Sequence, residues 1–165
     1  MAEAASSTTE KKFLTLKSED GDEFELEESI AIQSVTIKNM VEDGCSSSVV
    51  PLSNVDTETL IKIIDYLKMH SSTSSNEEEI ENFDKEFVNI GFKTIFKILE
   101  AANFLDINSL LELCAEAVAN RIKKKTPEVV RKIFNITSDF TLEEEAEIRN
   151  ETPWAFEGDL DHSLD

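Results

Sequence analysis

The side chains that could perform chemistry are few in this sequence and widely separated. Cys45 and Cys114 match neither the spacing of a zinc site nor that of a redox pair. The two histidines, His70 and His162, have no neighbours of the kind that bind a metal. We therefore expect no metal and no cofactor.

Carboxylates are abundant, and a pair of them could act as general acid and general base. They occur in runs such as residues 77–79 and 143–145, which are typical of solvated faces. The four glycines form no phosphate-binding loop, and no nucleophile stands beside a recognisable base. The sequence therefore argues against an enzyme.

The strongly negative net charge disfavours partners that are themselves negatively charged. Thirty-five acidic residues against sixteen basic ones give a formal net charge of -19, which repels nucleic-acid backbones and anionic lipid surfaces. No segment is long and apolar enough to span a bilayer, so we expect no nucleic acid and no membrane. The one basic run, Arg121 with Lys123, Lys124 and Lys125, fits a helix C-terminus, with a nuclear-import signal as the alternative.

The N-terminal residues 1–10 are rich in Ala, Ser and Thr, and we expect them to be disordered. They lack the basic and apolar regions of a signal peptide, and two thiols suggest a reducing compartment. We expect the protein in the nucleus and the cytoplasm.

The first half of the chain is expected to contain a small sheet and two helices. Residues 13–16 and 23–26 are expected to form a hairpin around Gly21, and residues 49–52 a third strand. Ser34 is expected to cap a helix that ends at Gly44 and packs inward through Val35, Ile37, Met40 and Val41. Asp56 opens a second helix, whose core stripe is Leu60, Ile63, Ile64 and Leu67.

The second half is expected to be helical. Residues 70–82 read as a mobile acidic loop, after which Phe83 and Phe87 open a short helical turn. Helices are predicted over residues 94–105 and 108–122. The order of elements predicts an α+β domain with helices gathered against a small sheet.

Two further short helices are predicted in residues 126–157. Thr126 precedes Pro127 as an N-cap, and Thr141 with Glu144 forms a capping box. The first helix has the stripe Val129, Val130, Ile133 and Phe134, whereas the second is almost entirely polar. Such short helices need a surface to dock on, either the chain's own core or a partner. Trp154 and Phe156 follow them, and these rings either fold back onto the domain or form a docking surface.

Several sequence blocks occur in an order that points to one family. They are residues 18–28 (SEDGDEFELEE), 30–43 (IAIQSVTIKNMVED), 50–55 (VPLSNV), 83–87 (FDKEF), 101–114 (AANFLDINSLLELC) and 118–128 (VANRIKKKTPE), followed by FNI, DFT, EEE and WAFE. Over about residues 12–157 the chain resembles the Skp adaptor subunit of Skp-cullin-F-box ubiquitin ligases.

The resemblance implies a BTB/POZ-like domain over residues 11–122 and two C-terminal F-box-binding helices within residues 123–157. Residues 158–165 extend beyond the family's usual WAFE end as an acidic tail. The family is a non-catalytic adaptor that links the N-terminal domain of a cullin to F-box proteins, which select substrates for ubiquitination and degradation.

The resemblance also implies two contact surfaces. The positions expected to bind an F-box are Ile98, Leu99, Val118, Ile122, Pro127, Val130, Ile133, Phe134, Ile136, Phe140 and Trp154. The positions expected to contact a cullin are Asn103 and Phe104, supported by Met40 and Val41. For each single residue, ordinary core packing is the competing interpretation.

Three departures from the family pattern touch these surfaces and suggest a diverged paralogue. Phe104 replaces a usual Tyr and removes a hydroxyl from the cullin contact. Glu100 replaces an apolar residue, so it is either exposed or narrows the range of F-boxes. Lys124 replaces a usual Gly at what looks like a C′ position, where a positive φ would be costly.

Two functions therefore remain open. The first is the ubiquitin-ligase adaptor. The second is a BTB-like F-box-binding or self-associating protein that no longer engages a cullin. In either case an uncovered apolar surface predicts weak self-association when no partner is bound.

Overall fold

The computed structural model describes residues 11–44, 49–72, 76–161 and 163. The expected disorder of residues 1–10 falls outside these ranges, as do Cys45 and His162.

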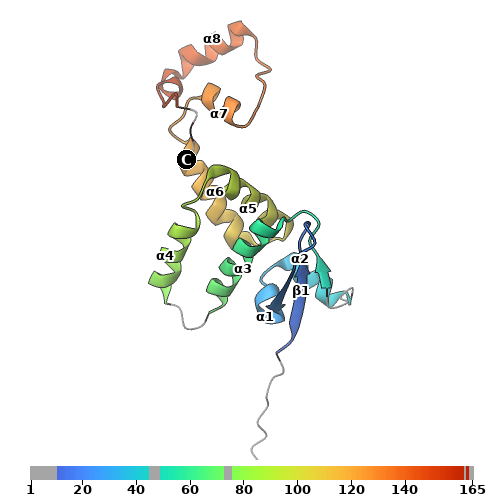
Figure 1. Ribbon diagram of the computed structural model, residues 1–165. Helices are drawn as coiled ribbons and strands as arrows, with labels where there is room; N and C mark the ends of the chain where they lie inside the picture. The colour runs from blue at the N-terminus through green and yellow to red at the C-terminus, as the bar shows by residue number, and fades with distance from the viewer. Residues whose placement is uncertain (1–10, 45–48, 73–75, 162, 164–165) are drawn as a thin grey trace, which may run out of the picture.

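A three-stranded sheet forms one end of the molecule (Figure 1). Strands β1 (Phe13–Lys17) and β2 (Glu23–Glu27) pair antiparallel, and Gly21 takes a φ of 94° in the turn between them. Strand β3 (Val49–Pro51) pairs parallel to β1, so the sheet order is β2-β1-β3. The predicted hairpin and third strand are confirmed.

Two short helices follow the hairpin, α1 (Glu28–Ala31) and α2 (Val35–Glu42). The Ser34 Oγ accepts a hydrogen bond from the Ile37 N–H, and Gly44 ends the segment with a φ of 65°. The predicted cap at Ser34 and the predicted stop at Gly44 are confirmed. The expectation that Val35 packs inward is wrong, because its side chain is 39% exposed while Ile37 is the buried residue of this helix. Val35 is the first residue of α2, and a residue at the end of a helix is buried only where a neighbouring element covers it.

Three longer helices pack beside the sheet: α3 (Thr57–Ser71), α5 (Phe92–Phe104) and α6 (Asn108–Ile122). The start of α3 is capped by Asp56, whose carboxylate accepts from the Thr59 N–H at 2.8 Å. One continuous core joins these helices to the sheet, and its fully buried members include Leu16, Leu60, Ile95 and Leu110. The fold is therefore α+β, as predicted.

The acidic stretch expected to be a mobile loop, residues 70–82, is largely helical in the described part of the chain. His70 and Ser71 end α3, and residues 77–82 form the first half of α4 (Glu77–Phe87). Asn76 and Glu79 make a reciprocal capping box. Phe83 and Phe87 therefore lie within α4 rather than opening a turn.

Contacts with α3 explain why this polar sequence forms a helix. The Phe87 ring lies 5.6 Å from the Tyr66 ring, and the Asp84 carboxylate lies 2.8 Å from the His70 Nε2. Composition alone indicated solvation, whereas packing of the apolar side chains against α3 stabilises the helix.

The C-terminal helices extend beyond the end of α6 (Figure 1). They are α7 (Pro127–Ile133), α8 (Leu142–Glu151) and the 3-10 helix η1 (Pro153–Phe156). The Thr126 cap and the Thr141–Glu144 capping box are both present, as predicted.

The backbone angles at the helix ends differ from the expectation for Lys124. Among the described residues, the non-glycine positions with positive φ are Asp106 and Asn135. Lys124 is not one of them, so the predicted strain at Lys124 is wrong. The positive φ comes instead just after α7 at Asn135, a residue type that tolerates it.

Candidate partner-docking surface

An open groove of about 790 Å3 lies between the α6–α7 connection, α7 and η1. Its apolar lining includes Pro127, Val130 and Trp154. Its charged lining includes three lysines, Lys123 to Lys125, together with the acidic residues Glu157 and Asp159. The structure thus brings together three of the predicted docking residues from two separate elements.

Local contacts explain why α7 presents this face. The Thr126 side chain is buried and caps the helix, and Val129 faces inward with only 3% exposure. Pro127 and Val130 lie off the buried side of the helix, so they remain half-exposed toward the groove.

Aromatic packing fixes the far end of α7. The Phe134 ring lies 5.9 Å from the Phe92 ring and 6.1 Å from the Phe96 ring. Both partners belong to α5, so Phe134 attaches the C-terminal lobe to the main domain. We define the C-terminal lobe as α7, α8 and η1.

Ion pairs hold α8 to α7, and a cation–π contact holds η1 to α8. Arg131 pairs with Glu145 at 3.6 Å, and Arg149 pairs with Glu128. The Arg149 guanidinium also lies 4.3 Å from the centre of the Phe156 ring. These contacts decide the open question about the aromatic pair, because Phe156 folds back whereas Trp154 remains 74% exposed.

The remaining predicted F-box positions fall into three classes. Ile136 and Phe140 are exposed in the α7–α8 connection, at 56% and 47%. Leu99, Ile122 and Ile133 are half-buried.

Ile98 and Val118 form the third class, the buried one, with exposures of 0% and 9%. In the free chain these two positions show ordinary core packing, the competing interpretation, and their part in an F-box contact stays a prediction. Helical spacing placed them on an apolar face, but that face is covered by the core.

In the C-terminal part of the chain, the structure also exposes apolar side chains that the sequence does not assign to a docking surface. Leu142 at the start of α8 is 86% exposed, and Leu160 in the acidic tail is 69% exposed. Neither residue belongs to an apolar stripe at helical spacing, so the sequence pattern does not mark them.

The predicted cullin-contact residues lie on α2 and the end of α5. The start of α2 is bound to the end of α5, because Thr36 Oγ1 donates to the Phe104 carbonyl at 3.0 Å and the Ser34 Oγ donates to the Leu105 carbonyl. Asn103 is exposed and Phe104 is half-buried. Met40 and Val41 are half-buried against the core, so the fold joins both segments in one corner.

Glu100 is exposed on α5. Of the two alternatives raised by this departure, exposure is the one observed, so the carboxylate incurs no burial cost in the free protein.

The described cysteine, Cys114, is buried in the core. Burial raises the pKa of the Cys114 thiol to about 12, which makes it a poor nucleophile at neutral pH. Within the described ranges, His, Cys, Asp and Glu side chains do not gather into a group that could hold a metal. In the same part of the chain, no helix has the length and apolar character needed to cross a membrane.

Comparison with known proteins gives consistent matches over most of the chain. Residues 12–72 match the model described as "Skp1 family, tetramerisation domain", and residues 108–155 match "Skp1 family, dimerisation domain". SKP1-like protein 11 of Arabidopsis thaliana is 48% identical over 149 residues, covering 88% of this chain and 98% of the relative. SKP1-like protein 1 of Oryza sativa subsp. japonica is 44% identical over 168 residues, covering 90% and 97%.

Proposed function

Because this chain belongs to the Skp1 family of ubiquitin-ligase adaptors, we propose that it links a cullin scaffold to F-box proteins, which deliver substrates for ubiquitination and degradation. In this role it performs no catalysis itself. It supplies two separate binding surfaces on one chain.

The groove carries the F-box half of the proposal. Trp154 has 74% of its surface exposed and lines the groove together with Pro127 and Val130. An exposed apolar patch of this kind is typical of a binding surface. An amphipathic helix that lays apolar side chains into such a groove would bury these residues. Aromatic anchors of this kind carry much of the affinity in helix-in-groove interfaces.

The corner between α2 and α5 carries the cullin half. Hydrogen bonds from Ser34 and Thr36 tie the start of α2 to the end of α5, so the predicted contact residues are held in one region. Asn103 offers an exposed amide there, and Phe104 offers an apolar edge without the hydroxyl of the usual Tyr.

Co-purification tests the two halves separately. Tagged protein is incubated with a purified F-box domain in one experiment and with a cullin N-terminal domain in another. We expect both to be retained, with Trp154→Ala reducing only F-box retention and Asn103→Ala reducing only cullin retention. Each variant thereby serves as the control for the other surface.

A second candidate function keeps the F-box surface but loses the cullin. The observation that favours it is Phe104, which lacks the hydroxyl expected at the cullin contact. Retention of the F-box domain without the cullin domain would support this alternative. Retention of neither domain would rule out both ligase roles.

We also propose that the free protein self-associates weakly. Exposed apolar residues on the C-terminal lobe would be shielded in such a contact, and a bound F-box would compete with it.

A further inference from the structure

The acidic tail returns to the connection between α6 and α7. The Asp159 N–H donates to the Lys124 carbonyl at 2.7 Å, and Lys125 and Asp159 form a parallel β-bridge. The Lys125 Nζ donates to the Asp161 carbonyl at 2.7 Å and lies 3.3 Å from the Asp159 carboxylate. Backbone and side-chain contacts therefore join two segments more than thirty residues apart in sequence.

The environment of Lys125 shows that these contacts are specific. Its side chain is only 6% exposed, and a buried ammonium group needs hydrogen-bonding partners to offset its lost hydration. The tail supplies both the carboxylate and the carbonyl. The Asp161 N–H and then Lys125 hold the pKa of the Asp159 carboxyl below its usual range, so this partner is ionised at neutral pH.

Gly158 allows this close approach. A Cβ atom at position 158 would lie 2.5 Å from the Lys124 carbonyl oxygen, far inside van der Waals contact. Any other residue would push the tail away from the connection. The sequence Gly158-Asp159 therefore has the steric and the electrostatic features that the contact needs.

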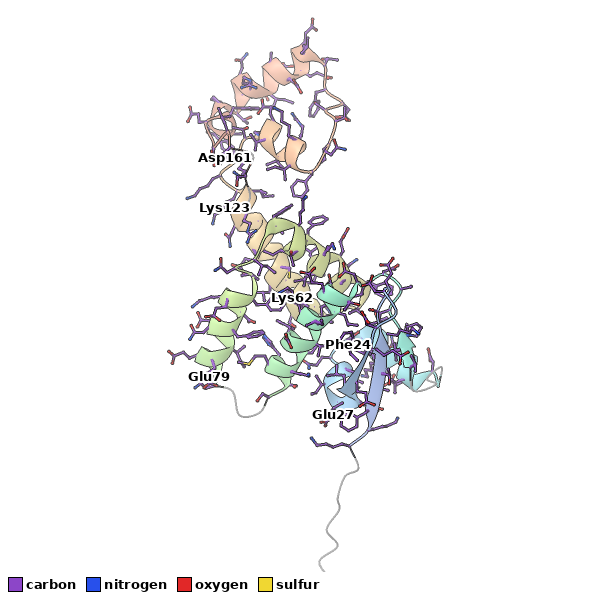
Figure 2. The ribbon with its side chains drawn as sticks, in the orientation of Figure 1. Phe24, Glu27, Lys62, Glu79, Lys123 and Asp161 are labelled. Carbon is purple, nitrogen blue, oxygen red and sulfur yellow. The ribbon has the colours of Figure 1, made fainter. Side chains whose placement is uncertain are left out.

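The tail closes the C-terminal lobe into a ring. The chain leaves the main domain at residues 123–125, passes through α7, α8 and η1, and returns to the same point through residues 158–161. Figure 2 shows Lys123 and Asp161 at this base of the lobe. The family-model match ends at residue 155, so the closing segment lies beyond it.

The closing segment is also part of the groove. Gly158 and Asp159 line it together with Pro127, Val130 and Trp154. Trp154 lies four residues before Gly158, so a short stretch of chain joins the tryptophan to the closing segment.

We propose that residues 158–161 form an intramolecular strap, which holds η1 and Trp154 beside α7 before a partner binds and thereby raises the affinity of the groove for an apolar helix. The identity of the partner rests on the proposed function. The strap itself does not, because it is a contact within the free chain. Affinity rises because the strap has already restricted η1 and the tryptophan, and binding then loses less conformational freedom.

Hydrogen exchange on the free, full-length protein tests the structural part. The variants are Gly158→Ala and a chain ending at Glu157, and Leu160→Ala is the matched control within the tail because its side chain is 69% exposed. We expect faster exchange in residues 123–130 and 152–157 for the first two variants, and unchanged exchange in α3 and α5. Leu160→Ala should match the wild type. Unchanged exchange in both strap variants would overturn the inference.

Binding to a purified F-box domain, measured by calorimetry, tests the functional part. We expect Gly158→Ala and the shortened chain to bind roughly 3- to 10-fold more weakly, about the cost of ordering one large side chain. Equal or tighter binding would overturn the inference, and tighter binding would identify the tail as an inhibitor instead. If the wild type binds no F-box domain, the proposed function fails while the exchange result still decides whether the strap exists.

Discussion

Asp56 has two roles at the start of α3. Its carboxylate caps the helix through the Thr59 N–H and pairs with Lys97 at 2.7 Å. We expect Asp56→Ala to lower the free energy of unfolding by about 1–2 kcal/mol, mainly through loss of the cap. Urea denaturation measures this. Lys97→Met is the control, since it removes the ion pair and keeps the cap, and it should cost less.

The same residue predicts a dependence on pH. The hydrogen bond from Lys97, followed by those from Thr59, lowers the pKa of Asp56 from 3.8 to about 2. Because the pKa is lower in the folded state, its stabilising effect is complete above about pH 4 and is lost as the pH falls toward 2. Asp56→Ala should therefore differ from the wild type at pH 6 by more than at pH 2. An equal difference at both pH values would contradict this assignment.

Trp154 is expected to matter for binding and not for folding. Because it is 74% exposed, Trp154→Ala should leave the free energy of unfolding nearly unchanged. At an F-box interface it should cost about 2 kcal/mol or more, roughly a 30-fold loss of affinity. Leu142→Ala, which removes an apolar side chain that is 86% exposed and does not line the groove, is the control. An equal loss in both variants would mean that binding is spread over the lobe.

At the scale of elements, α4 shows where local sequence was insufficient. Its capping pair, Asn76 and Glu79, is visible in the sequence, but the surrounding Ser and Glu residues favoured a loop. Contacts of Phe87 with Tyr66 and of Asp84 with His70 come from residues more than ten positions away. Such contacts stabilise a helix that its composition does not predict.

We expect Asn76→Ala to weaken α4 by about 1 kcal/mol, because one N-terminal backbone N–H loses its acceptor. Hydrogen exchange of the α4 amides should become faster, with little change in α5. Glu78→Ala is the control, since this exposed residue lies within the same first turn and makes no capping contact. Equal acceleration in both variants would show that the capping box does not stabilise α4.

For the whole molecule, net charge and exposed apolar area act in opposite directions on self-association. A formal charge of -19 keeps copies apart at low salt, whereas Trp154, Leu142 and Ile136 offer apolar contact area. We expect size-exclusion chromatography to show a larger species at high protein concentration, increasing with salt because the repulsion is screened. An added F-box domain should suppress it. A constant elution volume across a dilution series would rule out the association.

The sequence by itself determined where several of the helices begin. The caps at Ser34, Asp56, Thr126 and Thr141 each lie three residues before the N–H group that they satisfy, so their signals are local. The ordered motifs of the family likewise identified the fold class and the groove residues Pro127, Val130 and Trp154. These features depend on residue type and spacing, which a sequence contains in full.

Only the tertiary structure decided which side chains are covered. Ile98 is buried and Trp154 is exposed, although both are apolar residues in helices. The return of Gly158 to Lys124 was equally invisible, because the two lie far apart in sequence. Burial and close backbone approach depend on which distant segments pack together, and the free energy of that packing is a property of the folded chain as a whole.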